Sequence, residues 1–181
     1  MAINTQVLIL TFVSLVSFLG LSGCSDDQAL GAQNTQNIRH EQSTGVLLAN
    51  GDYAPVDLWA GQWRVVNIWA EWCKPCWHEI PELNEFHALQ MAMEADEVAS
   101  SVRLIGFNFD ELEQPEQLAL IEKMAIEFPS LISWPQVWQK PEIKGLPATL
   151  IIAPDNSVKD VLWGPQTQLI LSTALQKAGA F

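Results

Sequence analysis

The chain has 181 residues, a length that suits one domain of ordinary size together with non-structural ends. Hydrophobic residues make up 49% and charged residues 17%, a balance that excludes a disordered chain, a coiled coil and a collagen-like repeat. The formal charge is −12, from 9 Lys and Arg against 21 Asp and Glu, so the sequence lacks the basic excess on which nucleic-acid binding depends.

The first 23 residues form an apolar segment that has no charged side chain and that ends in small residues. Such a segment is typical of a secretory signal peptide rather than of folded structure. Its last residues, Leu-Ser-Gly before Cys24, resemble the signal of bacterial lipoproteins, in which the cysteine is lipidated and becomes the new N-terminus. We therefore expect a lipid anchor at Cys24 and a place in the bacterial cell envelope, facing the periplasm. An uncleaved membrane anchor and simple secretion are the alternatives, since the run nearly spans a bilayer of roughly 30 Å.

Residues 24–44 are mostly polar and show neither a helical nor a strand period, so we interpret them as a flexible tether that follows the lipidated cysteine. The folded domain then covers residues 45–181. No internal repeat and no second boundary divides it.

Hydrophobic periodicity predicts that strands alternate with helices along this domain. In chain order, we expect a hairpin of 46–48 with 56–59 around an Asn-Gly turn, a buried strand at 65–70, a helix from 73 into the 90s, a strand at 102–109, a helix at 115–128, a hairpin of 148–153 with 158–163, and a helix at 166–178. This order of elements is typical of a mixed α/β fold.

Two cysteines, Cys73 and Cys76, lie at the first turn of the first predicted helix, directly after the strand 65–70. At that spacing they can close a small disulfide. The unpaired N–H groups and the positive end of the helix dipole stabilise a thiolate there and lower the pKa of the first cysteine. We therefore predict that Cys73 is the nucleophile and Cys76 the resolving thiol. A static disulfide and half of a zinc site are the alternatives, and the position between strand and helix favours redox chemistry.

The two residues between the cysteines fit this interpretation. Lys74 adds a positive charge that favours the thiolate. Pro75 suits the first helical turn, because the N–H that it lacks would go unused there.

Residues 65–89 resemble the active-site strand and helix of the thioredoxin superfamily, and most of all its extracytoplasmic, membrane-tethered thiol–disulfide reductases of the TlpA/ResA type. Pro81, at the helix kink, and the segment 145–149, with Pro147 before a strand, extend the resemblance over the domain. The resemblance implies a thioredoxin fold: a central mixed sheet flanked by helices, with an N-terminal β-hairpin. It also implies a cis bond at Pro147 and a position beside the cysteines. The residues that it places in contact with substrate are Trp72, Lys74, Pro75, Leu146 and Pro147.

Two further positions bear on proton transfer. Asn67 stands where cytoplasmic thioredoxins carry a buried aspartate, and because an amide cannot relay a proton we interpret it as a hydrogen-bonded core residue. Glu79 matches a glutamate of the tethered reductases, and a partly buried carboxylate there could take the proton from Cys76. The alternative for Glu79 is an ordinary first-turn acid that complements the helix dipole.

The chain also carries eight tryptophans, which is unusual for one small domain. We expect Trp59, Trp63 and Trp163 to belong to the core. For Trp134 and Trp138 we favour packing over a role in a substrate groove.

Together these features predict an enzyme, a protein-disulfide reductase that uses the Cys73/Cys76 dithiol and needs no metal or other cofactor. The resemblance implies protein disulfides as substrates and a membrane electron-donor protein that re-reduces the pair. The intervening Lys-Pro dipeptide lacks the histidine of the strong oxidants in the superfamily, which favours reduction. The alternative is a Cu(I)-handling module for metalloprotein assembly, because thiolates suit Cu(I). The copper chaperones that it would resemble place three residues, rather than two, between their cysteines.

Overall fold

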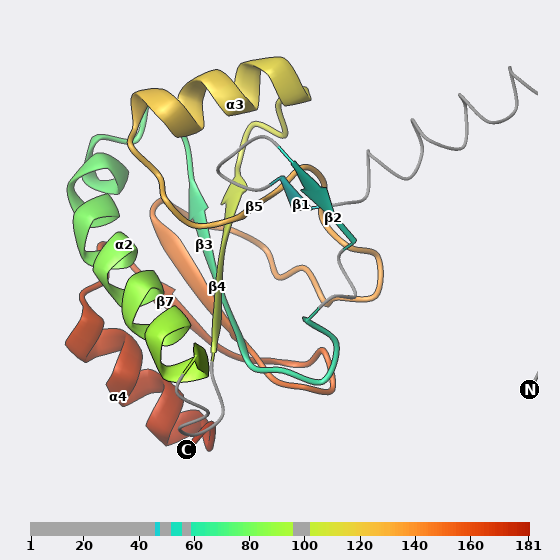
Figure 1. The fold of residues 1–181 in the computed structure, drawn as a ribbon, viewed down its shortest axis with the longest axis vertical. Helices are drawn as coiled ribbons and strands as arrows, with labels where there is room; N and C mark the ends of the chain where they lie inside the picture. Colours follow the sequence, from blue (N-terminus) through green and yellow to red (C-terminus); the bar gives the residue numbers. More distant parts are fainter. Residues whose placement is uncertain (1–45, 48–51, 56–58, 96–101) are drawn as a thin grey trace, which may run out of the picture.

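The computed structural model describes residues 46–47, 52–55, 59–95 and 102–181, which form one mixed sheet with helices packed against it (Figure 1). The strands are β1 (Val46–Leu47), β2 (Tyr53–Ala54), β3 (Arg64–Trp69), β4 (Arg103–Asn108), β5 (Ser130–Leu131), β6 (Ala148–Ile152) and β7 (Val158–Trp163). The helices are α2 (Lys74–Ala95), α3 (Gln114–Lys123) and α4 (Gln168–Ala178). The predicted signal peptide, Cys24 and the tether lie outside the described residues.

The sheet joins these strands in the order β2-β1-β5-β4-β3-β6-β7. Strand β3 runs parallel to β4 and antiparallel to β6, so it is paired on both sides. All six of its residues are buried, which explains why the strand is apolar apart from Arg64 and Asn67. Within the described ranges, no helix combines the length and the apolar character that crossing a membrane requires.

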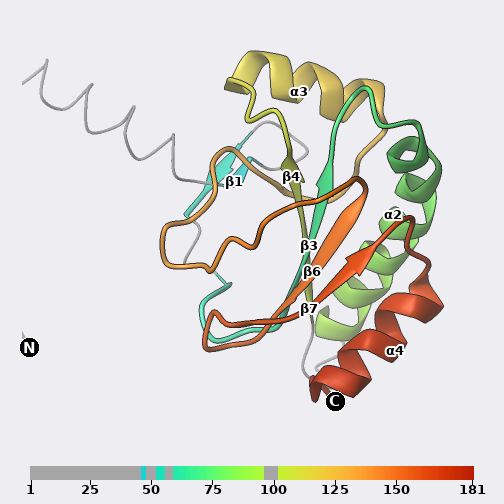
Figure 2. The same cartoon turned by 180° about the vertical axis from the view of Figure 1, so that it is seen from behind.

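One face of the sheet is covered by α2 and α4, as Figures 1 and 2 show from opposite sides. Alternate side chains of β3, Val65 and Trp69 among them, point into this layer. The helices contribute buried side chains at helical spacing: Cys76, Ile80, Leu83 and Phe86 from α2, and Leu171, Ala174 and Leu175 from α4. Burying one such large apolar side chain stabilises the fold by about 1.5–3 kcal/mol.

The other face is covered by the long connection between β5 and β6 (Figure 2). Trp138 of this connection is buried, and Trp134 packs against it edge to face at 6.0 Å between ring centroids. The guanidinium of the buried Arg64 lies over the Trp138 ring at 4.7 Å and donates to the Ala153 carbonyl at 2.7 Å. The expected packing of both tryptophans is confirmed. Trp163, by contrast, is 48% exposed, because β7 lies at the edge of the sheet.

The second predicted helix is wrong at its C-terminal end. The sequence predicts a helix at 115–128, and α3 ends at Lys123. Ala125 adopts a left-handed conformation (φ 54°), and the Ile126 N–H donates to the Ile121 carbonyl at 3.0 Å, which closes the helix. The apolar residues beyond this point are buried but lie outside the helix. Because the prediction relied on the spacing of buried apolar residues, it placed the end of the helix too late.

The N-terminal hairpin also differs from the prediction in its second strand. β1 pairs with β2 at Tyr53–Ala54, rather than with 56–59, and it pairs on its other side with β5. Pro55, which has no N–H to donate to a ladder, follows β2 directly. Trp59 is buried but lies in a short turn, and residues 56–58 are outside the described part of the chain.

Candidate active site

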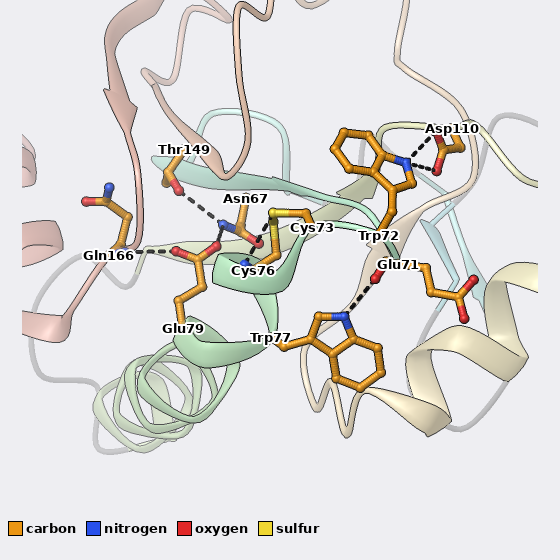
Figure 3. The surroundings of a disulfide bond; sticks show 10 residues. All are labelled: Asn67, Glu71, Trp72, Cys73, Cys76, Trp77, Glu79, Asp110, Thr149 and Gln166. Atoms are coloured by element: carbon orange, nitrogen blue, oxygen red, sulfur yellow. Dashed lines mark hydrogen bonds between the residues drawn. A yellow bond between two sulfur atoms is a disulfide. The ribbon is translucent and has the colours of Figure 1, made fainter.

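The first turn of α2 holds a disulfide between Cys73 and Cys76, with the sulfurs 2.06 Å apart (Figure 3). Cys73 directly precedes the helix, and its Sγ accepts the backbone N–H of Cys76 at 3.3 Å. This sulfur therefore occupies the place of a helix N-cap oxygen. When the disulfide is reduced, the same N–H and the helix dipole favour the thiolate form of Cys73.

The two sulfur-bearing residues differ in their access to solvent. Cys73 is 4% exposed and Cys76 is fully buried, so an incoming molecule reaches Cys73 first. The turn that presents Cys73 is fixed by its backbone N–H, which donates to the Ala70 carbonyl at 3.2 Å. Lys74 and Pro75 are exposed on the same turn, beside the disulfide.

Glu79 lies on α2 three residues after Cys76, and its carboxylate is enclosed by other elements of the fold. It is 1% exposed. One oxygen accepts from Asn67 Nδ2 on β3 at 2.8 Å, and the other accepts from the Gln166 backbone N–H at 2.8 Å. Burial raises the pKa of Glu79 from 4.5 to about 7, against the opposite effect of these two hydrogen bonds. A carboxylate that exchanges its proton near neutral pH therefore lies next to the cysteine turn.

The peptide bond between Leu146 and Pro147 is cis, and Pro147 is buried. Because β6 is antiparallel to β3, with Ala148 opposite Ile68, this loop lies at the sheet end where β3 leads into the cysteines. Leu146 is half-buried and packs against the clusters on both faces of the sheet. The fold thus brings the loop to the end of the sheet that carries the disulfide.

Around the disulfide, aromatic side chains form an exposed rim. Trp72 is 62% exposed, and its Nε1 donates to the Asp110 carboxylate at 3.0 Å. The Phe109 ring meets it edge to face at 6.1 Å. Phe109 and Asp110 directly follow β4, and the parallel neighbour β3 ends at the same edge. The edge-to-face contact and the hydrogen bond together hold the Trp72 ring in one orientation.

A second tryptophan and an ion pair connect the cysteine turn to α3. Trp77 Nε1 donates to the Glu71 carbonyl at 2.8 Å, and the Glu71 carboxylate meets Lys123 Nζ at 2.7 Å. Both charged groups are about half exposed, so the ion pair contributes to orientation more than to stability.

Asp110 and Gln166 are among the groups of this site that were not predicted from the sequence. Asp110 had a usable signal, since it follows a strand that runs parallel to β3. Gln166 contributes its backbone N–H, and no residue pattern marks a backbone contact. Among the described residues, no group of three or more His, Cys, Asp or Glu side chains is placed to hold a metal ion.

The chain is similar in sequence to known proteins, among them thiol–disulfide oxidoreductases. The AhpC/TSA family matches residues 46–161. The thiol–disulfide oxidoreductase ResA of Geobacillus thermodenitrificans is 27% identical over 109 residues, which cover 60% of this chain and 58% of that protein. The thioredoxin-like protein YneN of Bacillus subtilis is 26% identical over 110 residues, with 60% of each chain covered. The aligned part thus spans less than two thirds of these relatives.

Solved structures show the fold. StoA from Bacillus subtilis superposes with a TM-score of 0.55 at 20% identity, covering 71% of this chain and 92% of that one. A thiol:disulfide interchange protein of the thioredoxin family from Chlorobium tepidum gives 0.55 at 18% identity, covering 75% and 94%. The predicted thioredoxin fold is therefore confirmed.

Proposed function

Because this chain belongs to the AhpC/TSA family, we propose that it is a thiol–disulfide oxidoreductase that reduces the disulfides of envelope proteins. The observation that carries the proposal is the Cys73–Cys76 disulfide at the N-terminus of α2, in which Cys73 keeps a small exposed fraction and Cys76 is fully buried. The relative ResA is named a thiol–disulfide oxidoreductase and the relative YneN a thioredoxin-like protein, and both names support this proposal.

The reaction begins with the reduced pair. The Cys73 thiolate attacks one sulfur of the substrate disulfide, forms a mixed disulfide, and releases the other substrate sulfur as a thiolate that takes up a proton. We propose that the substrate chain contacts Trp72, Lys74 and Pro75 on the cysteine turn and the loop of Leu146 and Pro147. An extended peptide could pair with the Leu146 backbone beside Cys73.

The second step releases the substrate. Cys76 attacks Cys73 Sγ, the bond between Cys73 and the substrate breaks, and the Cys73–Cys76 disulfide forms again. Cys76 must lose its proton first, and the buried Glu79 carboxylate is the base within the same enclosure. Its pKa of about 7 lets Glu79 accept a proton near neutral pH and release it afterwards.

Each turnover leaves the pair oxidised, so two electrons must return from a donor. We propose a membrane electron-donor protein with its own dithiol, which becomes a disulfide as the Cys73–Cys76 bond is reduced. The electrons pass between sulfur atoms throughout, so the reaction needs no further cofactor.

We also propose that lipidation of Cys24 anchors the domain to a membrane of the bacterial envelope, facing the periplasm. The composition of the first 23 residues supports this location. In a Cys24→Ala variant the protein should leave the membrane fraction and keep its catalytic activity. Continued membrane association would contradict lipidation as the sole anchor.

Trapping of substrates tests the function itself. A Cys76→Ser variant of the full chain cannot resolve the mixed disulfide, so discrete envelope proteins should remain attached to Cys73 and be released by dithiothreitol. The matched Cys73→Ser variant should trap none of them, and the unmodified protein should turn over a protein disulfide. An unmodified protein that binds one Cu(I) ion and catalyses no disulfide reduction would contradict the proposal and favour the copper-handling alternative.

A further inference from the structure

The side-chain amide of Asn67 is buried, and its nitrogen and oxygen differ in their hydrogen-bond partners. It is fully buried on β3, between Val65 and Trp69 on the face that α2 covers. Both hydrogens of Nδ2 are used, by Glu79 Oε1 at 2.8 Å and by Thr149 Oγ1 at 3.2 Å. Oδ1 is equally buried and has no hydrogen-bond partner among the described residues. An unsatisfied buried acceptor of this kind destabilises the folded protein, so its presence calls for a physical reason.

The unpaired oxygen points toward the cysteines. In Figure 3 the nitrogen end of the Asn67 amide faces Glu79 and Thr149, and the oxygen end faces the Cys73–Cys76 disulfide. The hydrogen bond to Glu79 enforces this orientation, because a reversed amide would set its oxygen against the carboxylate. In the disulfide form, Cys76 Sγ has no hydrogen to donate to that oxygen.

Reduction supplies the missing donor. A dithiol donor breaks the sulfur–sulfur bond, gives up two electrons and two protons, and becomes a disulfide. Cys76 Sγ then carries an S–H group, which is fully buried, as is the Asn67 amide whose oxygen faces the disulfide in Figure 3. A thiol is a weak hydrogen-bond donor that a carbonyl oxygen can accept.

We propose that Asn67 is a positioning residue for the resolving thiol: in the reduced protein its Oδ1 accepts a hydrogen bond from the Cys76 S–H, while its Nδ2 holds the Glu79 carboxylate. This inference rests on the proposed function. The oxygen end of the amide thereby binds the thiol that must lose a proton, and the nitrogen end binds the carboxylate that receives this proton.

An asparagine suits this position better than an aspartate. At neutral pH an aspartate offers only acceptors, so it could not donate to Glu79. A charge at position 67 would also lie within about 3 Å of the Glu79 carboxylate, and like charges so close oppose ionisation. The amide leaves Glu79 as the group that titrates, and still provides an acceptor for the thiol.

The S–H stretching band of Cys76 tests the proposal directly. In the full chain with Cys24→Ala and Cys73→Ala, Cys76 is the sole thiol, and infrared spectroscopy reports its hydrogen bonding. We expect the band of the folded protein to lie at lower wavenumber than the band of the same protein in denaturant. Adding Asn67→Leu should abolish this difference. Adding Thr149→Val, which removes the other side-chain partner of Nδ2, should preserve it.

Two results would overturn the proposal: a band at the same wavenumber in the folded and unfolded parent, or a lowered band that survives in the folded Asn67→Leu protein. The first comparison needs no change at Asn67, so it holds even if Asn67→Leu fails to fold. The spectrum is independent of turnover. A lowered band that Asn67→Leu abolishes, in a protein whose unmodified form reduces no disulfide, would support the hydrogen bond and contradict the proposed function alone.

Discussion

The Glu79 carboxylate on α2 accepts the backbone N–H of Gln166 at 2.8 Å, although the two residues are 87 positions apart. Gln166 belongs to the connection between β7 and α4. In the same connection, the Gly164 N–H donates to the Pro147 carbonyl at 2.9 Å. The helix that carries the cysteines and the loop of Leu146 and Pro147 are thus fastened to one short segment, with Glu79 as the contact on the helix side.

The raised pKa of Glu79 makes stability depend on pH. Its pKa is about 7 in the folded protein and near 4.5 in the unfolded chain, so between these values the folded protein holds a proton that the unfolded chain has lost. Stability therefore falls as pH rises from 4.5 through 7. At 1.36 kcal/mol per pH unit the loss is on the order of 3 kcal/mol.

Urea unfolding of the unmodified protein and of Glu79→Gln, at about pH 4 and pH 8.5, measures this loss. The uncharged variant gives up one hydrogen bond, because its amide cannot accept from both Asn67 and Gln166, but that cost does not change with pH. We expect the unmodified protein to lose stability relative to the variant as pH rises. Parallel profiles would show that Glu79 does not titrate in this range.

Glu79→Gln should also slow the release of substrate. Without the carboxylate that receives the Cys76 proton, resolution of a preformed mixed disulfide should fall by roughly 10²-fold. In the unmodified protein this rate should rise with pH through about 7, and the variant should lose that rise. Stopped-flow release of a labelled substrate thiol measures it. Glu82→Gln changes an exposed acid on the same helix and should keep both rate and profile.

Trp72 offers a separate test of the substrate surface. Its ring is 62% exposed, so Trp72→Ala should change stability little while removing contact area beside Cys73. We expect KM for a protein disulfide to rise roughly tenfold, the size of effect typical of an exposed aromatic contact residue. A small aromatic disulfide should be reduced at an unchanged rate. Phe181→Ala, at the chain end remote from the first turn of α2 (Figure 1), is the matched control.

Gly106 on β4 leaves no space for a side chain. A Cβ there would lie 2.6 Å from Ser130 Oγ and 3.0 Å from Trp69 Nε1. Gly106→Ala should therefore lower the free energy of unfolding by about 1–3 kcal/mol, and Ser130→Ala in the same background should recover part of it. Gly145→Ala, where nothing lies within 4 Å, should be nearly neutral. Equal denaturation midpoints for the two alanine variants would contradict this.

Sequence patterns predict those parts of the site whose residues are neighbours in the chain. The apolar run of β3 and the two cysteines at a helix start are adjacent in sequence, so their geometry follows from strand and helix rules alone. The partners of these residues are distant. Neither the contact of Trp72 with Asp110 nor the contact of Glu79 with Gln166 has a sequence period, because both depend on which strands become neighbours.

The same limit applies to burial. From its sequence position near the start of a helix, Glu79 could equally be an exposed acid, and only the sheet register and the segment before α4 enclose it. The cover over the second face is similarly hidden, since the connection from β5 to β6 has no helical or strand pattern and packs through scattered tryptophans.

The residues proposed to position and receive the Cys76 proton, and the residues at the proposed substrate surface, are carried by different kinds of backbone. Asn67 and Glu79 are held by an interior strand and a long helix, whereas Trp72, Asp110 and Leu146 lie on connections at one sheet end. Connections tolerate sequence change far better than the elements they join. Under the proposed function, new partners can be acquired through sequence change in these three connections, while the sulfur chemistry is inherited intact.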